Sequence, residues 1–157
     1  MNEVPKKNFS IDIIMPTYNK VNYLDDSIKS IIYQSLKNWN LYIIDDNSTD
    51  DSLKIINKYS ELKNINIIKL KKNKGPSFCR NFGMRLSKSK YISFIDSDDT
   101  WDPKKLEKQI RFMEDNNFDF TYTDYTPFFE RDGIKKIKKS TSLVESFNFE
   151  TFIRNSS

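Results

Sequence analysis

The chain has 157 residues, of which 37% are hydrophobic and 31% charged, a balance typical of one folded globular domain. Its 26 basic and 22 acidic side chains leave a net charge of only +4, which gives no reason to expect nucleic-acid binding. Histidine is absent and Cys79 is the only cysteine, so Ser-His-Asp and Cys-His catalysis, an internal disulfide and a histidine or thiolate zinc site are excluded. A bound metal must therefore have oxygen ligands, which Mg²⁺ and Mn²⁺ prefer.

Short β-branched runs alternate along the chain with segments whose hydrophobic residues recur at helical spacing. In chain order, the pattern predicts a strand over residues 11–15, a helix over 23–34, a strand over 39–44, a helix carrying Leu53, Ile56 and Tyr59, and a strand over 65–68. It continues with a helix striped by Phe78, Phe82 and Leu86, a strand over 91–95, a helix that opens at Pro103 with Leu106, Ile110 and Met113 inward, and a strand over 118–122. This alternation predicts an α/β fold with a mostly parallel sheet sandwiched by helices.

The pattern weakens after Tyr125. Residues 128–134 predict a hairpin that turns at Asp132 and Gly133, and residues 149–154 predict the start of another helix. The basic cluster Lys135–Lys139 is interpreted as a solvated loop or a weak contact with anionic lipid. Residues 1–10 lack the apolar run of a signal peptide, and no segment is long and apolar enough to cross a bilayer. We therefore expect a cytoplasmic protein, or one peripheral to the inner face of the membrane.

Polar residues follow three of the predicted strands directly: Pro16–Asn19, Asp45–Ser48 and Asp96–Asp99. In an open parallel sheet, ligands bind beyond the carboxyl ends of the strands. Three carboxylates within Asp96–Asp99 repel one another unless a divalent cation, which also bridges to phosphate oxygens, neutralises them. The alternative is a solvated turn whose aspartates cap the next helix.

Two further polar segments, the Asp45–Asp46 pair and the loop and helix start around Gly75 and Arg80, can each be interpreted in two ways. Asp45 and Asp46 can cap the following helix or accept a hydrogen bond from the imide N–H of a uracil-like base, and we expect the pair to do both, with one side chain capping and the other pointing into the cleft. Gly75 permits a positive φ or a close approach of the backbone to a ligand, and Asn73 and Asn81 flank this loop. Arg80 is either an ordinary surface arginine or offers its fork of donors to a carboxylate or a phosphate. Cys79 is expected to be a small core residue.

Four segments in this order resemble the family 2 glycosyltransferases of the GT-A fold, over roughly residues 9 to 125. They are Ile13–Asn19, Ile43–Asp50, Asn73–Asn81 with its Gly75 and Arg80, and Tyr91–Asp99. The resemblance implies inverting transfer of a sugar from a nucleotide-diphosphate donor, most commonly a UDP-sugar, to a glycan or lipid-linked acceptor in polysaccharide or cell-envelope synthesis. The partners are then the nucleotide sugar and that acceptor, and no nucleic acid is expected.

The resemblance also implies roles for individual residues. Pro16, Thr17, Tyr18 and Asn19 line the nucleoside pocket, Asp45 or Asp46 contacts the base, and Asp96 lies at the ribose or in the metal shell. Asp98 is the leading ligand of Mn²⁺ or Mg²⁺, which neutralises the departing diphosphate. The full set predicted to bind the nucleotide sugar is Pro16, Thr17, Tyr18, Asn19, Asp45, Asp46, Asn73, Gly75, Arg80, Asp96 and Ser97, and the predicted metal ligands are Asp98 and Asp96.

The catalytic base, an Asp or Glu downstream in this family, is not identifiable from the sequence. The available carboxylates are Asp124, Glu130, Asp132, Glu145 and Glu150, and nothing in their context selects one. We therefore expect residues 1–10 to be an N-terminal extension, 11–125 the nucleotide-sugar-binding core and 126–157 an incomplete start of the acceptor side. On this basis the chain is the donor-binding part of a longer enzyme, a shortened product, or a module that binds a nucleotide sugar without transferring it.

Two further enzyme classes fit less well. Asp96–Thr100 after an apolar strand is similar to the first motif of haloacid-dehalogenase-like phosphatases, but that motif belongs on the first strand of its fold, and here three strand–helix units precede it. A dinucleotide-binding dehydrogenase requires Gly-x-Gly-x-x-Gly after the first strand, and this sequence has only Gly75, Gly83 and Gly133.

Overall fold

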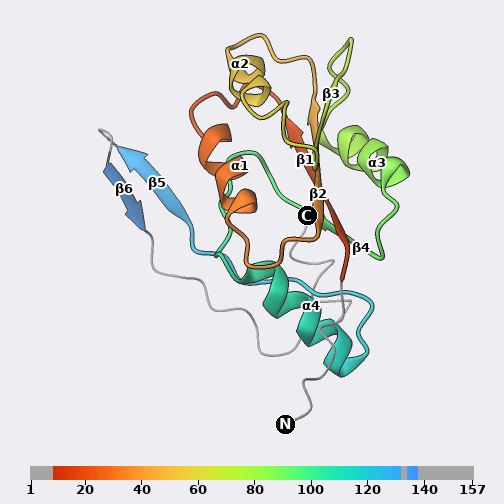
Figure 1. Ribbon diagram of the computed structural model, residues 1–157. Coiled ribbons are helices and arrows are strands. Elements are labelled where there is room, and N and C mark those ends of the chain that lie inside the picture. Colours follow the sequence, from red (N-terminus) through yellow and green to blue (C-terminus); the bar gives the residue numbers. More distant parts are fainter. Residues whose placement is uncertain (1–8, 132–133, 138–157) are drawn as a thin grey trace, which may run out of the picture. The chain divides into compact units, whose positions relative to one another are not determined.

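A computed structural model of the chain describes residues 9–131 and 134–137 (Figure 1). The chain divides into two compact units, Met1–Asn117 and Phe118–Ser157. The first unit contains the sheet, its helices and all of the predicted site residues, and the second contains a hairpin.

Four parallel strands form the sheet of the first unit, in the order β3-β2-β1-β4. They are β1 (Ile11–Thr17), β2 (Trp39–Asp45), β3 (Ile65–Lys69) and β4 (Tyr91–Phe94). All seven residues of β1 are buried, as expected of an apolar strand with a neighbour on each side. Thr17, the last residue of β1, lies beside Asp45, the last residue of β2, so the loops that follow these two strands start at the same level.

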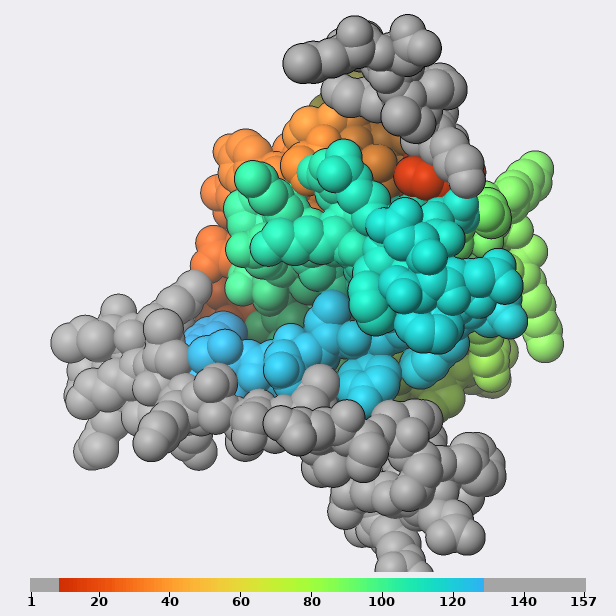
Figure 2. Space-filling model, turned by 90° about the horizontal axis from the view of Figure 1, so that it is seen from below, coloured from red at the N-terminus to blue at the C-terminus, as the bar shows by residue number. Residues whose placement is uncertain are grey.

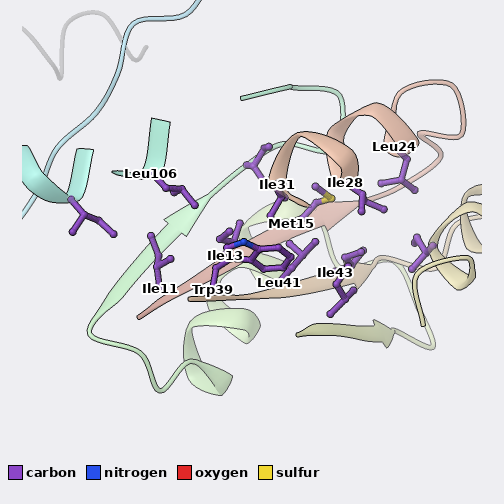
Figure 3. Close-up of a cluster of buried hydrophobic side chains, with 14 residues drawn as sticks. Ile11, Ile13, Met15, Leu24, Ile28, Ile31, Trp39, Leu41, Ile43 and Leu106 are labelled. Carbon is purple, nitrogen blue, oxygen red and sulfur yellow. The ribbon is translucent and has the colours of Figure 1, made fainter. Parts of the chain in front are cut away.

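Helices cover both faces of this sheet. They are α1 (Leu24–Ile32), α2 (Ser52–Asn57), α3 (Pro76–Leu86) and α4 (Lys105–Asn116). Figure 1 shows α1 and α3 on opposite faces. The larger core cluster joins α1 and α4 to one face, and Figure 3 shows Ile28 and Ile31 of α1 packed with Ile13 of β1 and Leu41 of β2. The expected sandwich of a parallel sheet between helices is therefore confirmed.

The face of α3 that packs on the sheet differs from the predicted stripe. Cys79 and Gly83 are buried, whereas Phe78 is 41% exposed and Leu86 36% exposed. A Cβ atom at Gly83 would lie 2.6 Å from Cγ2 of Ile14, so only glycine lets the helix approach β1 this closely. Of the predicted stripe, Phe82 does pack against the buried cluster of Ile14, Ile44 and Cys79, but the fully buried residues of α3 are the small ones. The expectation that Cys79 is a core residue is confirmed.

The buried amide of Gln34 joins α1 to the chain before α4. It donates to the carbonyls of Ser30 (3.0 Å) and Asp102 (2.8 Å), and its oxygen accepts the N–H of Leu106 at 3.1 Å. Gln34 lies beyond the end of α1, although the pattern predicted helix through it, and α4 starts two residues after the predicted opening at Pro103. Figure 2 shows the outer surface of α4 in teal, next to orange surface from the part of the chain that contains α1 and the segment after it.

The second unit confirms one prediction and contradicts another. Strands β5 (Phe128–Arg131) and β6 (Ile134–Ile137) pair antiparallel, as the hairpin prediction required, with its turn at 132–133 outside the described residues. The strand predicted over 118–122 is wrong, because residues 118–127 belong to no helix or strand. Phe120 is 74% exposed, and alternation of large side chains specifies a strand only where one face is buried. The predicted helix at 149–154 and residues 138–139 of the basic cluster lie outside the described residues.

Candidate functional site

Three loops meet at the carboxyl edge of the sheet. They follow β1, β2 and β4, and the arrowhead of β1 in Figure 1 points to the end of the sheet where the loops leading into α2 and α3 also lie. The backbone joins the first two loops, since the N–H of Asp46 donates to the carbonyl of Thr17 at 2.8 Å. The sequence-based expectation that polar segments after the strands come together is met for these residues.

Asn19 fastens the first loop to the second. It adopts a positive φ of 52°, which asparagine tolerates better than most residues. Its N–H donates to Ser48 Oγ at 3.0 Å, and its side-chain oxygen accepts the N–H groups of Thr49 (2.8 Å) and Asp50 (3.3 Å). Asn19 therefore shapes the site through hydrogen bonds within the chain, in addition to any contact with a ligand.

Asp46 holds a further loop in place, the one between β3 and α3. The residue is 3% exposed, and its two carboxylate oxygens accept the N–H groups of Lys74 and Gly75, each at 2.7 Å. Gly75 has a φ of 86° directly before α3, so the prediction of a positive φ there is confirmed. Burial, followed by the charge of Asp46, raises the pKa of the Cys79 thiol to about 11, which keeps that thiol protonated and unreactive at neutral pH.

Asp45 is completely buried, and its carboxylate accepts the N–H of Ser48 at 3.2 Å. The helix-capping interpretation of the Asp45–Asp46 pair is wrong, because α2 begins only at Ser52 and its N-cap is Asp51. Both carboxylates instead stabilise loops. A carboxylate has about four acceptor positions, so each retains capacity for a ligand donor.

The acidic segment follows Ile95 and is paired with two basic side chains. Arg80 of α3 donates to the carboxylate of Asp96. The ammonium of Lys20, in the loop after β1, lies 2.6 Å from Oδ2 of Asp98, and this hydrogen bond raises the pKa of Lys20 above its ordinary value. A backbone turn, in which the N–H of Asp99 donates to the carbonyl of Asp96 at 3.0 Å, shapes the segment. Helix capping by these aspartates is not observed, since the N-cap of α4 is Lys104.

The remaining predicted residues differ in exposure. Pro16, Thr17 and Ser97 are buried, Tyr18 is 44% exposed, and Asn73 is exposed in the loop before α3. The buried hydroxyl of Thr17 has no hydrogen-bond partner among the described residues, which leaves one polar atom at this edge unsatisfied.

Sequence reasoning missed Lys20, which directly follows the predicted Pro16–Asn19 segment. Its only local signal is a basic residue one position beyond that segment. Its partner Asp98 is 78 residues away, and no periodicity or spacing rule connects them.

The family model for glycosyl transferase family 2 matches residues 12–156. The chain belongs to glycosyl transferase family 2. The resemblance seen in the four sequence motifs is thereby confirmed, and the phosphatase and dehydrogenase alternatives are discarded.

Several relatives align with most of this family 2 chain. An uncharacterized glycosyltransferase of Rickettsia conorii is 42% identical over 92% of the chain and 22% of the relative. The putative teichuronic acid biosynthesis glycosyltransferase TuaG of Bacillus subtilis is 32% identical over 92% of the chain and 57% of the relative. WfaP of Escherichia coli, a UDP-Glc:α-D-GlcNAc-diphosphoundecaprenol β-1,3-glucosyltransferase, is 39% identical over 79% of the chain and 48% of the relative. The chain thus spans less than two thirds of the length of each.

Solved structures agree with the fold. Residues 1–349 of S. aureus TarS in complex with UDP align with 69% of this chain and 33% of that one, at 28% identity and a TM-score of 0.65. The predicted GT-A architecture is therefore confirmed. Among the described residues, no helix combines the length and apolar character needed to span a bilayer.

Proposed function

We propose that this family 2 chain binds a nucleotide-diphosphate sugar, specifically a UDP-sugar, together with Mn²⁺ or Mg²⁺ at the carboxyl edge of its sheet. The observation that carries the proposal is the convergence of Asp96 and Asp98 with the loops after β1 and β2, which Asn19 and Asp46 hold in place. UDP is favoured because TarS has been solved with UDP and, separately, with UDP-GlcNAc.

Each part of the site has a role in this proposal. The exposed ring of Tyr18 contacts the nucleoside, and the nucleoside provides a hydrogen-bond partner for the unsatisfied hydroxyl of Thr17. Asp45 or Asp46 uses a remaining acceptor position for a base N–H. Arg80 turns its donors from Asp96 to the diphosphate. Asn73, Gly75 and Ser97 complete the wall of the nucleotide-sugar pocket.

Asp98 and Asp96 are the residues that would hold the divalent cation. No group of three Asp, Glu, His or Cys side chains among the described residues is arranged to hold a metal. Mg²⁺ sites of this kind commonly use one or two carboxylates and take their other ligands from phosphates and water, so the two aspartates fit. When bound, the cation neutralises charge on the diphosphate leaving group. A mannosyltransferase of Pyrobaculum calidifontis, 17% identical, has been solved with GDP-Man and Mn²⁺, a likeness that extends to the fold alone.

The reaction we propose is inverting transfer of the sugar to a glycan or lipid-linked acceptor in cell-envelope polysaccharide synthesis. WfaP is named for a diphosphoundecaprenol-linked acceptor, and S. aureus TarP, 38% identical, for poly(ribitol-phosphate). With an acceptor of this kind, the proposed place of the reaction is the cytoplasm, at the inner face of the membrane. Residues 11–125 serve as the donor core and 126–157 as the start of the acceptor side.

The direct test is a thermal-shift titration with UDP, GDP, CDP and dTDP, each with and without Mn²⁺. A ligand at about 100 times its dissociation constant adds about 2.7 kcal/mol of stability, which raises the Tm of a domain this size by roughly 5–10 °C. We expect that shift with UDP, and the larger part of it only with Mn²⁺. No shift with any nucleotide would contradict the proposal.

The Asp98→Ala variant tests the metal assignment in the same assay. It should lose the Mn²⁺-dependent part of the shift while its own Tm stays within a few degrees, because the carboxylate is 41% exposed. The control is Asp102→Ala, an exposed aspartate on the loop that leads to α4. Asp98→Ala binding UDP and Mn²⁺ as tightly as the wild type would remove Asp98 from the metal site.

A second candidate function is binding of the nucleotide sugar without transfer. It is favoured because no carboxylate in the sequence can be assigned as the base: Asp124 is exposed in the second unit, and the side chains of Glu130, Asp132, Glu145 and Glu150 lie outside the described set. Release of UDP from a UDP-sugar on addition of candidate acceptors would identify transfer. Binding of UDP with no release in their presence would identify the binding module.

A further inference from the structure

Each carboxylate of the Asp96–Asp98 segment already has a positively charged partner from another element. Arg80 of α3 pairs with Asp96, and Lys20 of the loop after β1 pairs with Asp98. A carboxylate oxygen is the preferred ligand of an ammonium and of a divalent cation alike. An ammonium 2.6 Å from Oδ2 of Asp98 therefore competes with a metal ion for this carboxylate, and the two positive charges repel each other when both are bound to it.

Hydrogen bonds hold the backbone of Lys20, whereas its side chain contacts Asp98 through the terminal ammonium. Its N–H donates to the buried hydroxyl of Ser52 at 2.9 Å, and its carbonyl accepts the N–H groups of Tyr23 and Leu24, each at 3.0 Å. The side chain beyond this anchor is 38% exposed and makes a single charged hydrogen bond to Asp98. A lysine ammonium on a four-carbon stem can turn to a new partner without any change in the backbone, so this ion pair can be exchanged.

We propose that Lys20 is a positioning residue that occupies Asp98 until a nucleotide diphosphate arrives, so that the divalent cation and the diphosphate bind together. The inference rests on the proposed function. A metal ion that binds alone either displaces the ammonium or shares the carboxylate with it, and in both cases the ammonium is left next to a new positive charge. When the diphosphate binds as well, its negative oxygens accept the displaced ammonium, and the exchange is compensated. Because coupling between two ligands is reciprocal, the metal also strengthens nucleotide binding by the same factor.

The alternative is that the Lys20–Asp98 pair only supports the fold. Half-exposed ion pairs contribute little to stability, so removing this one should leave folding intact. A structural role alone predicts no change in the affinity for a metal ion. Competition predicts tighter metal binding when the ammonium is removed, and that sign separates the two explanations.

The experiment measures Mn²⁺ affinity of the full chain by calorimetry and by the electron paramagnetic resonance of free Mn²⁺, without and with UDP. Lys20→Met removes the charge and keeps the stem. We expect its affinity for Mn²⁺ alone to rise by a factor of about 1.5 to 5, the range set by an exposed ion pair. The factor by which UDP tightens Mn²⁺ binding should fall. The matched control is Lys29→Met, which breaks the Lys29–Asp25 ion pair of the same 2.6 Å length on α1.

Unchanged or weaker binding of Mn²⁺ alone by a folded Lys20→Met protein would overturn the inference. Lys20→Gln, which also removes the charge, provides the same comparison if the methionine variant folds poorly. The outcome for the wild type separates this inference from the proposed function. A wild type that binds neither UDP nor Mn²⁺ refutes both, whereas one that binds them cooperatively, with the same coupling in Lys20→Met, refutes only the role of Lys20.

Discussion

Aspartates at the two edges of the same sheet are held in contrasting ways. At the amino edge, Asp12 of β1 is 1% exposed and accepts the backbone N–H groups of Lys88 (2.7 Å) and Ser89 (3.0 Å). The amide of Asn40 and the hydroxyl of Ser89 complete its hydrogen bonds. At the carboxyl edge, Asp98 is 41% exposed and is held by one lysine side chain.

The kind of donor separates a carboxylate that maintains the fold from one that is available to a ligand. Backbone N–H groups are fixed in space, so the charge of Asp12 is permanently satisfied and joins β1 to the chain just before β4. A lysine stem can move away, so the charge of Asp98 can be offered to another cation. Asp46 shares one feature with each of them. Like Asp98 it lies at the carboxyl edge, and like Asp12 it accepts hydrogen bonds from backbone N–H groups, here with both oxygens.

The largest effect that we expect is from Asp12→Ala. The variant leaves the amide of Asn40 and the backbone N–H groups of Lys88 and Ser89 without their acceptor, so the free energy of unfolding should fall by about 2 kcal/mol. Urea unfolding measures this loss, and the folded fraction should keep the UDP affinity of the wild type. Asp98→Ala is the matched control, with a stability change within about 0.5 kcal/mol. Equal stability losses in the two variants would remove the distinction between the edges.

A smaller and mixed effect is expected from Asp46→Ala. Loss of its two hydrogen bonds releases the loop at Lys74 and Gly75 and should cost about 1 kcal/mol in unfolding free energy. We also expect UDP affinity without metal to fall by about tenfold, which corresponds to about 1.4 kcal/mol. Asp51→Ala, an exposed aspartate paired only with Lys54, is the control for both measurements. Lower stability with unchanged UDP affinity would assign the base contact to Asp45 or to neither residue.

Local patterns in the sequence were sufficient for the sheet and for the prediction that polar segments gather at its carboxyl edge, where we propose the site. The runs Ile11–Met15 and Trp39–Ile44 have the spacing of buried strands, and polar residues follow each one directly. Because parallel strands align their carboxyl ends, these polar segments had to meet at one edge. The order of elements therefore contained most of the information about where the site lies.

Other features depend on contacts that no local pattern describes. The ion pair between Lys20 and Asp98 and the hydrogen bonds from Lys88 and Ser89 to Asp12 join segments more than 70 residues apart. The burial of Gly83 depends on how closely α3 approaches Ile14, a distance that hydrophobic periodicity does not contain. The error at 118–122 has the same origin, since alternation describes which side chains share a face and burial decides whether that face becomes part of a sheet.

The smallest expected effect is on the pH dependence of stability. Burial alone raises the pKa of Asp12, but the hydrogen bonds from Asn40, Ser89 and Lys88 outweigh it and hold the pKa below the ordinary value of 3.8. A lowered pKa in the folded state stabilises the protein at pH values above 3.8, and this contribution is lost as the pH falls through the lowered pKa. The difference in unfolding free energy between the wild type and Asp12→Asn should therefore be constant from pH 5 to 7 and shrink below about pH 4.

The same titration of Asp98→Asn provides the comparison at the other edge. A wild-type advantage over Asp12→Asn that grows on acidification would mean that Asp12 is folded in its protonated form, and the contrast between a fixed and an exchangeable carboxylate would then be lost.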